Sequence, residues 1–340
     1  MRYGPIPTRL VEHLALLAGD IPLPMLDALL ALVKARSLMA AVELDVIGCL
    51  RERTCTADEV ASARQLDRDS AYLLLRVLAF SGYVRQRGNA FGLTRLGRST
   101  LLPEGRNSSV DYLRWNYTQW KYFDGFEHML TAGHGRTVHD AIADWPSYLG
   151  GMLEIARRFA PLLARSVPVS KGATTLIDIA GAHGLFGEAI AKRHRSMRAT
   201  VLELPDAVPH ARAIAERHGI DVDHQVCDVL ADAIPPADVA LIANLVHHLD
   251  VGSAASLVHK TCAALRPGGT IAVWELELPP VSVKADFTDA IALYFRLTSG
   301  SRCYRGEEIA AWFAGCESIR IKRFVRAPGY VLVTGRAPQS

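Results

Sequence analysis

Three acidic residues follow one another at the ends of three predicted strands. Asp178 lies in the apolar run that begins at Thr175, Glu203 comes twenty-five residues later at the end of a second run, and Asp228 follows a third run after another twenty-five residues. The carboxyl ends of parallel strands meet at one edge of a sheet, where ligands bind. A carboxylate there accepts charge-assisted hydrogen bonds from hydroxyl groups. The spacing therefore predicts a cleft for a nucleoside.

The glycines after Asp178 indicate which nucleoside. Gly181, Gly184 and Gly187 follow the spacing GxxGxxG, whereas a dinucleotide-binding loop has GxGxxG so that backbone amides can approach a pyrophosphate. S-adenosylmethionine has no phosphate, and it needs close backbone approach for its ribose and amino acid group. The pattern therefore favours S-adenosylmethionine over NAD.

Each of the three acids has a task in such a cleft. Glu203 suits the ribose hydroxyls and Asp228 suits the adenine amino group. Asp178 would lie beneath the cofactor, where it fixes the loop or meets the methionine ammonium. Any one of them alone could be a solvated turn residue, but three in register are far more specific.

The elements that position these acids follow from the pattern after residue 173. Apolar runs alternate with helical patterns, which is typical of a doubly wound, mainly parallel α/β sheet. The predicted strands are residues 174–180, 199–204, 221–227, 237–244, 269–276, 317–325 and 329–335.

The first 105 residues are predicted to be mostly helical. A helix over about 22–41 has apolar residues on more than one face, which calls for partners on several sides. Residues 56–61 have the spacing of a capping box and open a short helix. A second helix over 67–84 and a hairpin over 84–94 complete a winged-helix pattern.

A winged helix that binds DNA needs a basic, exposed face on its second helix. Here that helix contains the mostly apolar run AYLLLRVL, and the net charge of the chain is only +3 with both signs interspersed. This gives no electrostatic case for nucleic acid or membrane partners. We therefore predict homodimerisation through this domain. A winged-helix regulator whose second domain senses a nucleoside-like ligand is the alternative.

Three segments are predicted: a dimerisation domain over 1–105, a helical linker rich in aromatic residues over 106–170, and the cofactor-binding domain over 171–340. The six cysteines include no CxxC pair. We interpret them as reduced thiols of a cytoplasmic protein. No apolar run approaches the length of a membrane span.

Together these motifs resemble those of the plant-type small-molecule O-methyltransferases and their bacterial relatives in secondary metabolism. The resemblance extends from about Pro24 to Arg336 and implies a class I S-adenosylmethionine-dependent enzyme, with a Rossmann-like methyltransferase domain preceded by a winged-helix dimerisation domain. The motifs that carry it are residues 178–184, 203–205, 228, 236–250, 265–269 and 273–275.

The resemblance implies a set of cofactor contacts. Leu204 and Val229 would pack against the adenine, and Asn244 would lie near it. The chain departs from the family's glycine-rich loop at Ala180 and Ala182. The complete predicted cofactor-binding set is Asp178, Gly181, Gly184, Glu203, Leu204, Asp228, Val229 and Asn244.

The resemblance also implies a general base. The His of the family's His-Asp-Trp motif matches His247, which is followed by His248 and Leu249. One of the two Glu residues that brace this base matches Glu275, while Cys303 occupies the position of the other. A histidine that removes the proton of a phenol accelerates its reaction by about 10²- to 10⁴-fold. His247 and Glu275 are the predicted catalytic residues.

The predicted acceptor is a small hydroxylated aromatic, and the spent cofactor is S-adenosylhomocysteine. Deprotonating a phenol activates its oxygen and the neighbouring ring carbon, so O-methylation and C-methylation both stay open. His134 could also be an exposed loop residue. The predicted substrate-binding residues are Trp120, Phe123, His134, Trp145, Phe287 and Tyr294.

Two further interpretations complete the analysis. Leu249 and Cys303 leave open a relative that keeps the cofactor but catalyses another reaction, such as a cyclisation. A metal centre is not predicted, because the chain has no HxxxH, HxH or Cys-His ligand grouping, and adjacent His247 and His248 are expected to point in different directions.

Overall fold

The chain divides into two compact units, Met1–Trp120 and Lys121–Ser340. The structure is a computed structural model that describes residues 6–7, 9–137, 142 and 144–339. The division falls fifteen residues beyond the predicted end of the first domain at 105, because the helix over 110–119 packs against the long N-terminal helix over 23–43. Residues 121–170, predicted as a linker, belong to the second unit.

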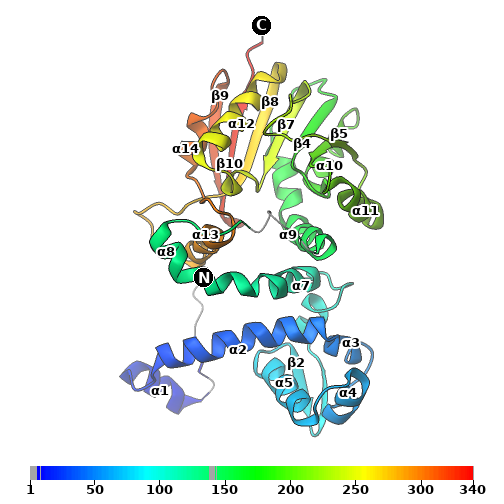
Figure 1. Ribbon diagram of the computed structural model, residues 1–340, viewed down its shortest axis with the longest axis vertical. Coiled ribbons are helices and arrows are strands. Elements are labelled where there is room, and N and C mark those ends of the chain that lie inside the picture. The colour runs from blue at the N-terminus through cyan, green and yellow to red at the C-terminus, as the bar shows by residue number, and fades with distance from the viewer. Residues whose placement is uncertain (1–5, 8, 138–141, 143, 340) are drawn as a thin grey trace. The chain divides into compact units, whose positions relative to one another are not determined.

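The first unit is mostly helical, as predicted, and contains one small antiparallel sheet in the order β1-β3-β2. Its elements are α1 (Leu10–Ala18), α2 (Leu23–Glu43), α3 (Val46–Cys49), β1 (Cys55–Thr56), α4 (Ala57–Arg64), α5 (Arg68–Phe80), β2 (Val84–Arg87), β3 (Ala90–Leu93), α6 (Arg95–Thr100) and α7 (Val110–Gln119) (Figure 1).

The winged-helix pattern forms for the local reasons that the sequence indicates. Thr56 caps α4, and its backbone N–H donates to the Glu59 carboxylate at 2.7 Å, which completes the capping box. Asp67 caps α5 in the same manner, accepting from the Ser70 N–H at 2.8 Å. The buried face of α5 consists of Ala71, Leu75 and Leu78, so this helix contributes to the core of its unit.

The second unit holds a seven-stranded sheet in the order β6-β5-β4-β7-β8-β10-β9. The strands are β4 (Thr175–Ile179), β5 (Arg198–Glu203), β6 (Asp223–Val226), β7 (Ala237–Ala243), β8 (Leu265–Leu276), β9 (Glu317–Phe324) and β10 (Ala327–Arg336). All neighbours are parallel except that β10 runs antiparallel to both β8 and β9. Every predicted strand is present.

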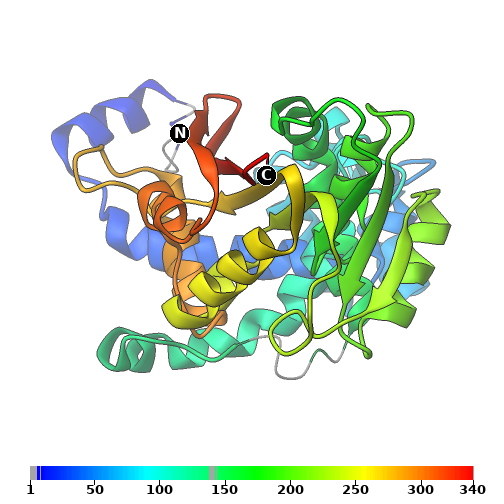
Figure 2. The ribbon, with the colours of Figure 1, turned by 90° about the horizontal axis from the view of Figure 1, so that it is seen from above.

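Helices cover both faces of this sheet (Figure 2). Side chains alternate between the faces along each strand. Ile177 therefore packs toward α12 (Val251–Ala263) and α14 (Gly306–Ala311), whereas its neighbour Leu176 packs toward α9 (Trp145–Ser166) and α10 (Leu185–Ala191). The helices are the 3-10 helix Trp120–Gly125, α8 (Phe126–Ala132), α9 (Trp145–Ser166), α10 (Leu185–Ala191), α11 (Val208–His218), the 3-10 turn Val246–His248, α12 (Val251–Ala263), α13 (Phe287–Thr298) and α14 (Gly306–Ala311).

Candidate functional site

Asp178 lies at the centre of the loop that joins β4 to α10. Its side chain is fully buried, and its Oδ2 accepts a hydrogen bond from the Gly187 N–H at 3.0 Å. Its Oδ1 has no hydrogen-bond partner among the described residues. Burial raises the pKa of Asp178 to about 7, with the nearby charge of Glu203 adding to the effect. The carboxylate therefore ties the loop to α10 and leaves Oδ1 available for the predicted cofactor contact.

The two glycines of the predicted cofactor loop are required by packing inside the protein. A Cβ on Gly181 would lie 2.4 Å from Cγ of Asp178. Gly184 has a φ of +76°, and a Cβ there would lie 2.8 Å from a methyl group of Val201 and 2.7 Å from one of Val222. The prediction attributed these glycines to close approach of a ligand. The structure adds a different reason: the Asp178 carboxylate and two valines already fill the space.

The two alanines at the family's glycine positions take left-handed backbone conformations. Ala180 has a φ of 51° and Ala182 a φ of 52°, which is uncommon for a residue with a Cβ. The Ala182 N–H donates to Oε1 of Glu203 at 2.9 Å. The loop therefore keeps the glycine-like path without the glycines, and a carboxylate on the next strand helps to hold it.

Glu203 ends β5 and faces this loop. Its Oε2 accepts from the Leu204 N–H at 3.1 Å, and burial raises the pKa of its carboxyl. Because each carboxylate oxygen has two acceptor positions, both oxygens can take further hydrogen bonds from ligand hydroxyls. The position fits the predicted ribose contact.

The remaining predicted cofactor residues lie at neighbouring strand ends. Oδ1 of Asp228 accepts from the Leu230 N–H at 3.0 Å, so this acid also caps its own turn. Val229 is buried, and Leu204 is half exposed. Asn244 follows β7 in a left-handed conformation with a φ of 54°. Since β6, β5, β4 and β7 are adjacent and parallel, their carboxyl ends bring these residues to one edge.

The predicted base and its brace are in contact. Nδ1 of His247 lies 2.5 Å from Oε1 of Glu275, and both side chains are almost completely buried. The backbone N–H groups of Val246 and Leu276 each donate to the Glu275 carboxylate at 2.9 Å. Glu275 is thereby fixed at the end of β8, and it orients the imidazole that follows β7.

The other ring nitrogen of His247, Nε2, differs from Nδ1 in its contacts. Nε2 is buried and has no hydrogen-bond partner among the described residues. The ring packs against Phe295, with 4.0 Å between centroids. The neighbouring His248 ring lies equally close, at 4.0 Å, so the expectation that the two rings point apart was wrong. The 3-10 turn over 246–248 brings them together.

Cys303 lies where the resemblance leads one to expect a second carboxylate. Its thiol is buried, and burial together with the charge of Glu275 raises its pKa, so it stays neutral. The structure also adds Ser301 and Tyr304, whose hydroxyls both donate to the backbone carbonyl of Leu249. No motif marked these two residues in the sequence. The only signal was two hydroxyl side chains flanking Cys303.

Two of the predicted substrate residues lie along one aromatic series that ends at the base. The rings of Phe123 and Tyr294 have centroids 6.4 Å apart, and Tyr294 contacts Phe295 at 5.8 Å. Phe295 in turn contacts His247. The contacts of α13 therefore link Phe123 and Tyr294 to His247, the predicted base.

The other four predicted substrate residues are not shown next to the base. Trp145 begins α9 and stacks on His210 of α11 at 5.6 Å. His134 is exposed, although its neighbour Gly135 donates to the Arg296 carbonyl of α13 at 3.0 Å. Phe287 is the first residue of α13, and Trp120 ends the first unit. Their contact with a substrate stays a prediction.

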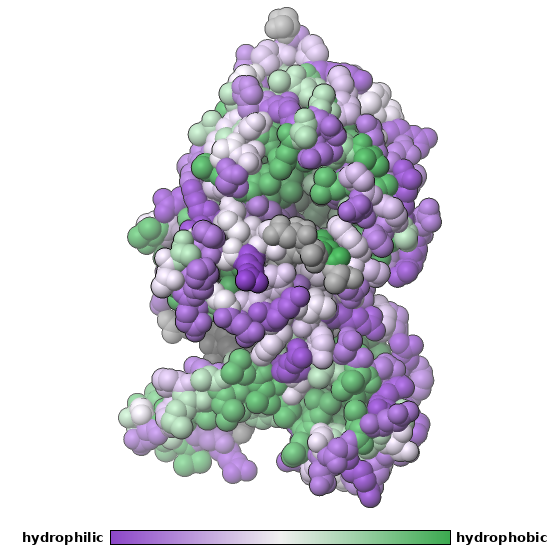
Figure 3. Space-filling view, viewed as in Figure 1, coloured by the Kyte–Doolittle hydropathy of each residue, from purple (hydrophilic) through white to green (hydrophobic). Residues whose placement is uncertain are grey.

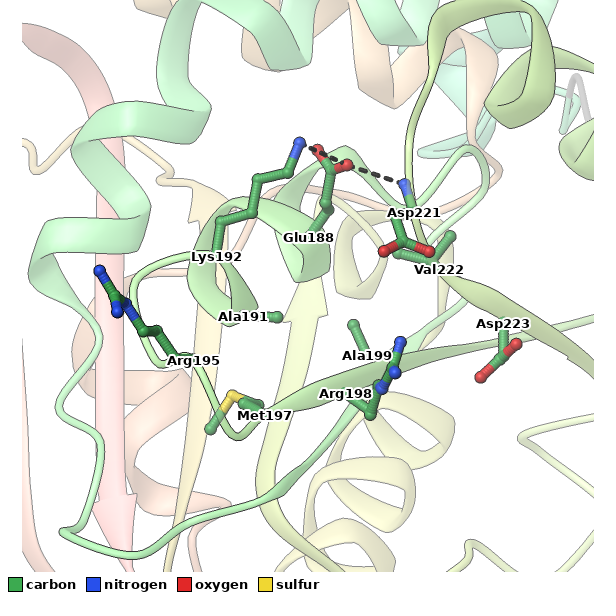
Figure 4. Close-up of a pocket in the computed structure, with 10 residues that line it drawn as sticks. All are labelled: Glu188, Ala191, Lys192, Arg195, Met197, Arg198, Ala199, Asp221, Val222 and Asp223. Atoms are coloured by element: carbon green, nitrogen blue, oxygen red, sulfur yellow. Dashed lines mark hydrogen bonds and ion pairs between the residues drawn. The ribbon is translucent and has the colours of Figure 1, made fainter.

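A separate concave region lies at the amino ends of β5 and β6 and has a volume of about 320 Å³ (Figure 4). Its charged side chains come from α10, from the loop between α10 and β5, and from the starts of the two strands and the residues before β6. Buried Glu188 pairs with Lys192 at 2.8 Å and accepts from the Asp221 N–H at 2.8 Å, which ties α10 to the segment before β6. This edge is opposite the one that holds Glu203. No cluster of His, Cys, Asp or Glu suited to a metal ion is found in the described part of the chain.

Comparison with known proteins identifies the class and the family of this chain. The family model for the O-methyltransferase domain matches residues 132–312. Among named relatives, a mitomycin biosynthesis 6-O-methyltransferase of Streptomyces lavendulae is 26% identical over 267 residues, or 73% of this chain and 75% of the relative. A 3-O-methylredipecamine 2-O-methyltransferase of Carapichea ipecacuanha is 24% identical over 253 residues, or 68% of this chain and 69% of the relative.

Two solved structures share the fold over nearly the whole chain. Human N-acetylserotonin methyltransferase in complex with S-adenosylmethionine has a TM-score of 0.81 at 17% identity, with 98% of this chain and 100% of that chain covered. Mitomycin 7-O-methyltransferase MmcR also has a TM-score of 0.81, at 23% identity, with 96% and 99% covered.

The chain therefore belongs to the plant-type O-methyltransferase family. Its cofactor is S-adenosylmethionine. The residues present fit this group, because the buried Oδ1 of Asp178 has no partner among the described residues and Glu203 keeps acceptor capacity at the adjacent strand end. No described helix is both long and apolar enough to span a membrane.

Proposed function

We propose that this chain methylates a small hydroxylated aromatic metabolite, on oxygen or on the ring carbon beside it, with His247 as the general base. The observation that carries the proposal is the 2.5 Å hydrogen bond between Nδ1 of His247 and Oε1 of Glu275. A histidine whose Nδ1–H is held by a carboxylate presents Nε2 as its basic nitrogen.

The bound cofactor supplies the electrophilic methyl group, so the chain's own task is to position the acceptor and to take its proton. A phenol has a pKa of about 10 and is a weak nucleophile near neutral pH. His247 takes the proton at Nε2, and the adjacent Glu275 stabilises the resulting imidazolium. Because both groups are buried, this interaction is only weakly screened by water.

The acceptor class follows from the surroundings of the base and from the relatives. Phe123, Tyr294 and Phe295 provide aromatic surface on the side of the base that α13 occupies. The relatives include a tetracenomycin polyketide 8-O-methyltransferase and a protein named as an N,N-dimethyltransferase. Most of these relatives are named as O-methyltransferases, which favours a phenolic hydroxyl as the acceptor.

The test replaces His247 and follows turnover and binding separately. The substrates are catechol, naphthol and coumaric acid, with S-adenosylmethionine labelled on its methyl group. His247→Ala should lower turnover by about 10²- to 10⁴-fold, while calorimetry shows S-adenosylhomocysteine affinity within about twofold of wild type. His259→Ala, an exposed histidine of α12, is the matched control and should be unaffected. Unchanged turnover in His247→Ala would remove the base from the mechanism.

Product mass separates this proposal from a relative that keeps the cofactor without transferring its methyl group. A gain of one methylene unit marks transfer, and a rearranged product of unchanged mass marks another reaction. The DNA-binding alternative is not favoured, because Arg68 and Arg76 of α5 bind Asp58 and Gln86 and the helix exposes apolar Leu73. A gel-shift assay at low salt tests it.

A further inference from the structure

The carbonyl oxygen of Leu249 accepts hydrogen bonds from two side chains that lie more than fifty residues further along the chain. The Ser301 hydroxyl donates to it at 2.5 Å and the Tyr304 hydroxyl at 2.7 Å. Both donors are buried, with Ser301 7% and Tyr304 1% exposed. A backbone carbonyl rarely has two buried side-chain donors, because most such groups are satisfied by other backbone. We call these three groups the Leu249 clamp.

The Leu249 clamp closes the turn that carries the base. The turn over 246–248 is held at its start by the Val246 N–H, which donates to Oε2 of Glu275 at 2.9 Å. It is held at its middle by the bond between His247 and Glu275, and directly after it by the clamp. A three-residue turn fixed before, at and after the histidine leaves the imidazole little freedom to move.

Tyr304 is itself held in place, which makes it suitable for this task. The Arg302 guanidinium lies 4.4 Å from the centroid of its ring, and both terminal nitrogens of Arg302 bind the Glu308 carboxylate, at 2.7 and 3.3 Å. The ring of Trp312 meets Tyr304 edge-on at 4.9 Å. Burial raises the pKa of the Tyr304 phenol. Its O–H therefore stays a donor throughout the neutral pH range.

The sequence around Cys303 explains why such a clamp is needed. At Cys303 the chain has a buried, neutral thiol where the resemblance leads one to expect a second carboxylate beside the base. Ser301 and Tyr304 lie on either side of that position in the same segment, and the backbone of Tyr304 pairs with Glu277, the residue that follows β8. The segment that lacks the expected carboxylate thus supplies two neutral hydrogen-bond donors.

We propose that Ser301 and Tyr304 are positioning residues for the reaction, and that they hold His247 in its productive orientation through the carbonyl of Leu249. The inference rests on the proposed role of His247. In this chain, a hydroxyl pair acting on the backbone would then stand in for a carboxylate acting on the imidazole.

The experiment compares Ser301→Ala, Tyr304→Phe and the double variant with wild type. Thr261→Val is the control, because it removes a hydroxyl that is equally buried but donates only to Leu257 within α12. Each single variant should lower kcat roughly fivefold and the double variant at least roughly twentyfold, as small misplacements of a reacting group do. The KM for the acceptor and the S-adenosylhomocysteine affinity should stay within about twofold, and Thr261→Val should match wild type.

A second readout needs no acceptor. In protein saturated with S-adenosylhomocysteine, proton NMR should show a downfield, slowly exchanging signal from the His247 Nδ1–H, assigned by its loss in Glu275→Gln. The double variant should lose or broaden this signal, and Thr261→Val should keep it. An unchanged signal and unchanged kcat in the double variant would overturn the inference. An equal loss of cofactor affinity and turnover in the double variant would also overturn it, since the substitutions would then disturb the whole site and not the orientation of His247 alone.

One further comparison separates this inference from the proposed function. In a His247→Ala background, Tyr304→Phe should cause no additional loss, because there is no imidazole left to orient. If His247→Ala is inactive and Tyr304→Phe is fully active, the positioning role of the Leu249 clamp is contradicted, while the role of His247 as general base is retained. If His247→Ala keeps full turnover, the proposed function fails and the clamp fails with it.

Discussion

Asp178 is the residue whose protonation should be visible in cofactor binding. Its folded-state pKa of about 7 lies well above the value of about 3.9 for an exposed Asp, so it is protonated below pH 7. Binding a ligand that carries an ammonium favours the ionised form, and affinity then rises as pH increases through 7. S-adenosylhomocysteine should bind about tenfold more tightly at pH 8 than at pH 6, measured by calorimetry.

The isosteric variant Asp178→Asn is the control for that measurement. It keeps an oxygen for the Gly187 N–H and removes the titration, so its affinity should be nearly independent of pH. If the variant retains the wild-type pH dependence, the titrating group is a different one, and Glu203, whose pKa is also raised by burial, is the next candidate.

The sequence predicted which residues belong to the candidate site better than it predicted the contacts that those residues make. The bond between His247 and Glu275 followed from a resemblance, and the structure places the two in contact. The two donors to Leu249 could not be predicted, because a serine and a tyrosine carry no spacing signal and their acceptor is backbone. Likewise, the contact of Trp145 with His210 depends on how α9 and α11 pack.

At the scale of elements, the alternation of apolar runs was sufficient to predict all seven strands of the large sheet. The signal of each strand is local, because a strand buried on both faces of such a sheet is a continuous run of apolar residues. The reason for the loop glycines was not local. Gly184 must be a glycine because Val201 and Val222, on two other segments, occupy the space beside it.

Gly184→Ala and Gly172→Ala therefore form a matched pair. Both glycines have positive φ values, +76° and +87°, but a Cβ on Gly172 meets nothing within 4 Å. The shared backbone strain should cost each variant about 1 kcal/mol of unfolding free energy. Gly184→Ala should lose about 1–3 kcal/mol more through overpacking, and it should also weaken S-adenosylhomocysteine binding. Denaturant unfolding of both variants measures the difference, and equal losses would contradict the packing argument.

At the scale of the whole molecule, the first unit exposes many large apolar side chains on α1 and α2, and contiguous apolar surface of this kind marks interaction sites. Figure 3 shows hydrophobic side chains gathered over the N-terminal helices. The exposed apolar residues of α1 and α2 are Leu10, Val11, Leu14, Leu17, Met25, Leu29, Leu30, Leu32 and Val33. A helix that is apolar on several faces within one chain requires a partner, and a second copy of the same unit would supply one by two-fold symmetry.

We therefore expect a homodimer whose interface includes α1 and α2. Light scattering should give twice the chain mass, and the melting temperature should rise with protein concentration, because dissociation accompanies unfolding. Leu29→Glu replaces a side chain that is 61% exposed in the single chain and should shift the protein to monomer. Val325→Glu is the control, since Val325 is 99% exposed in the turn between β9 and β10 of the other unit. A monomeric wild type would contradict this expectation. So would a dimer that persists in the double variant Leu29→Glu with Leu14→Glu. Either result would show that the apolar face is not an interface between copies of this chain.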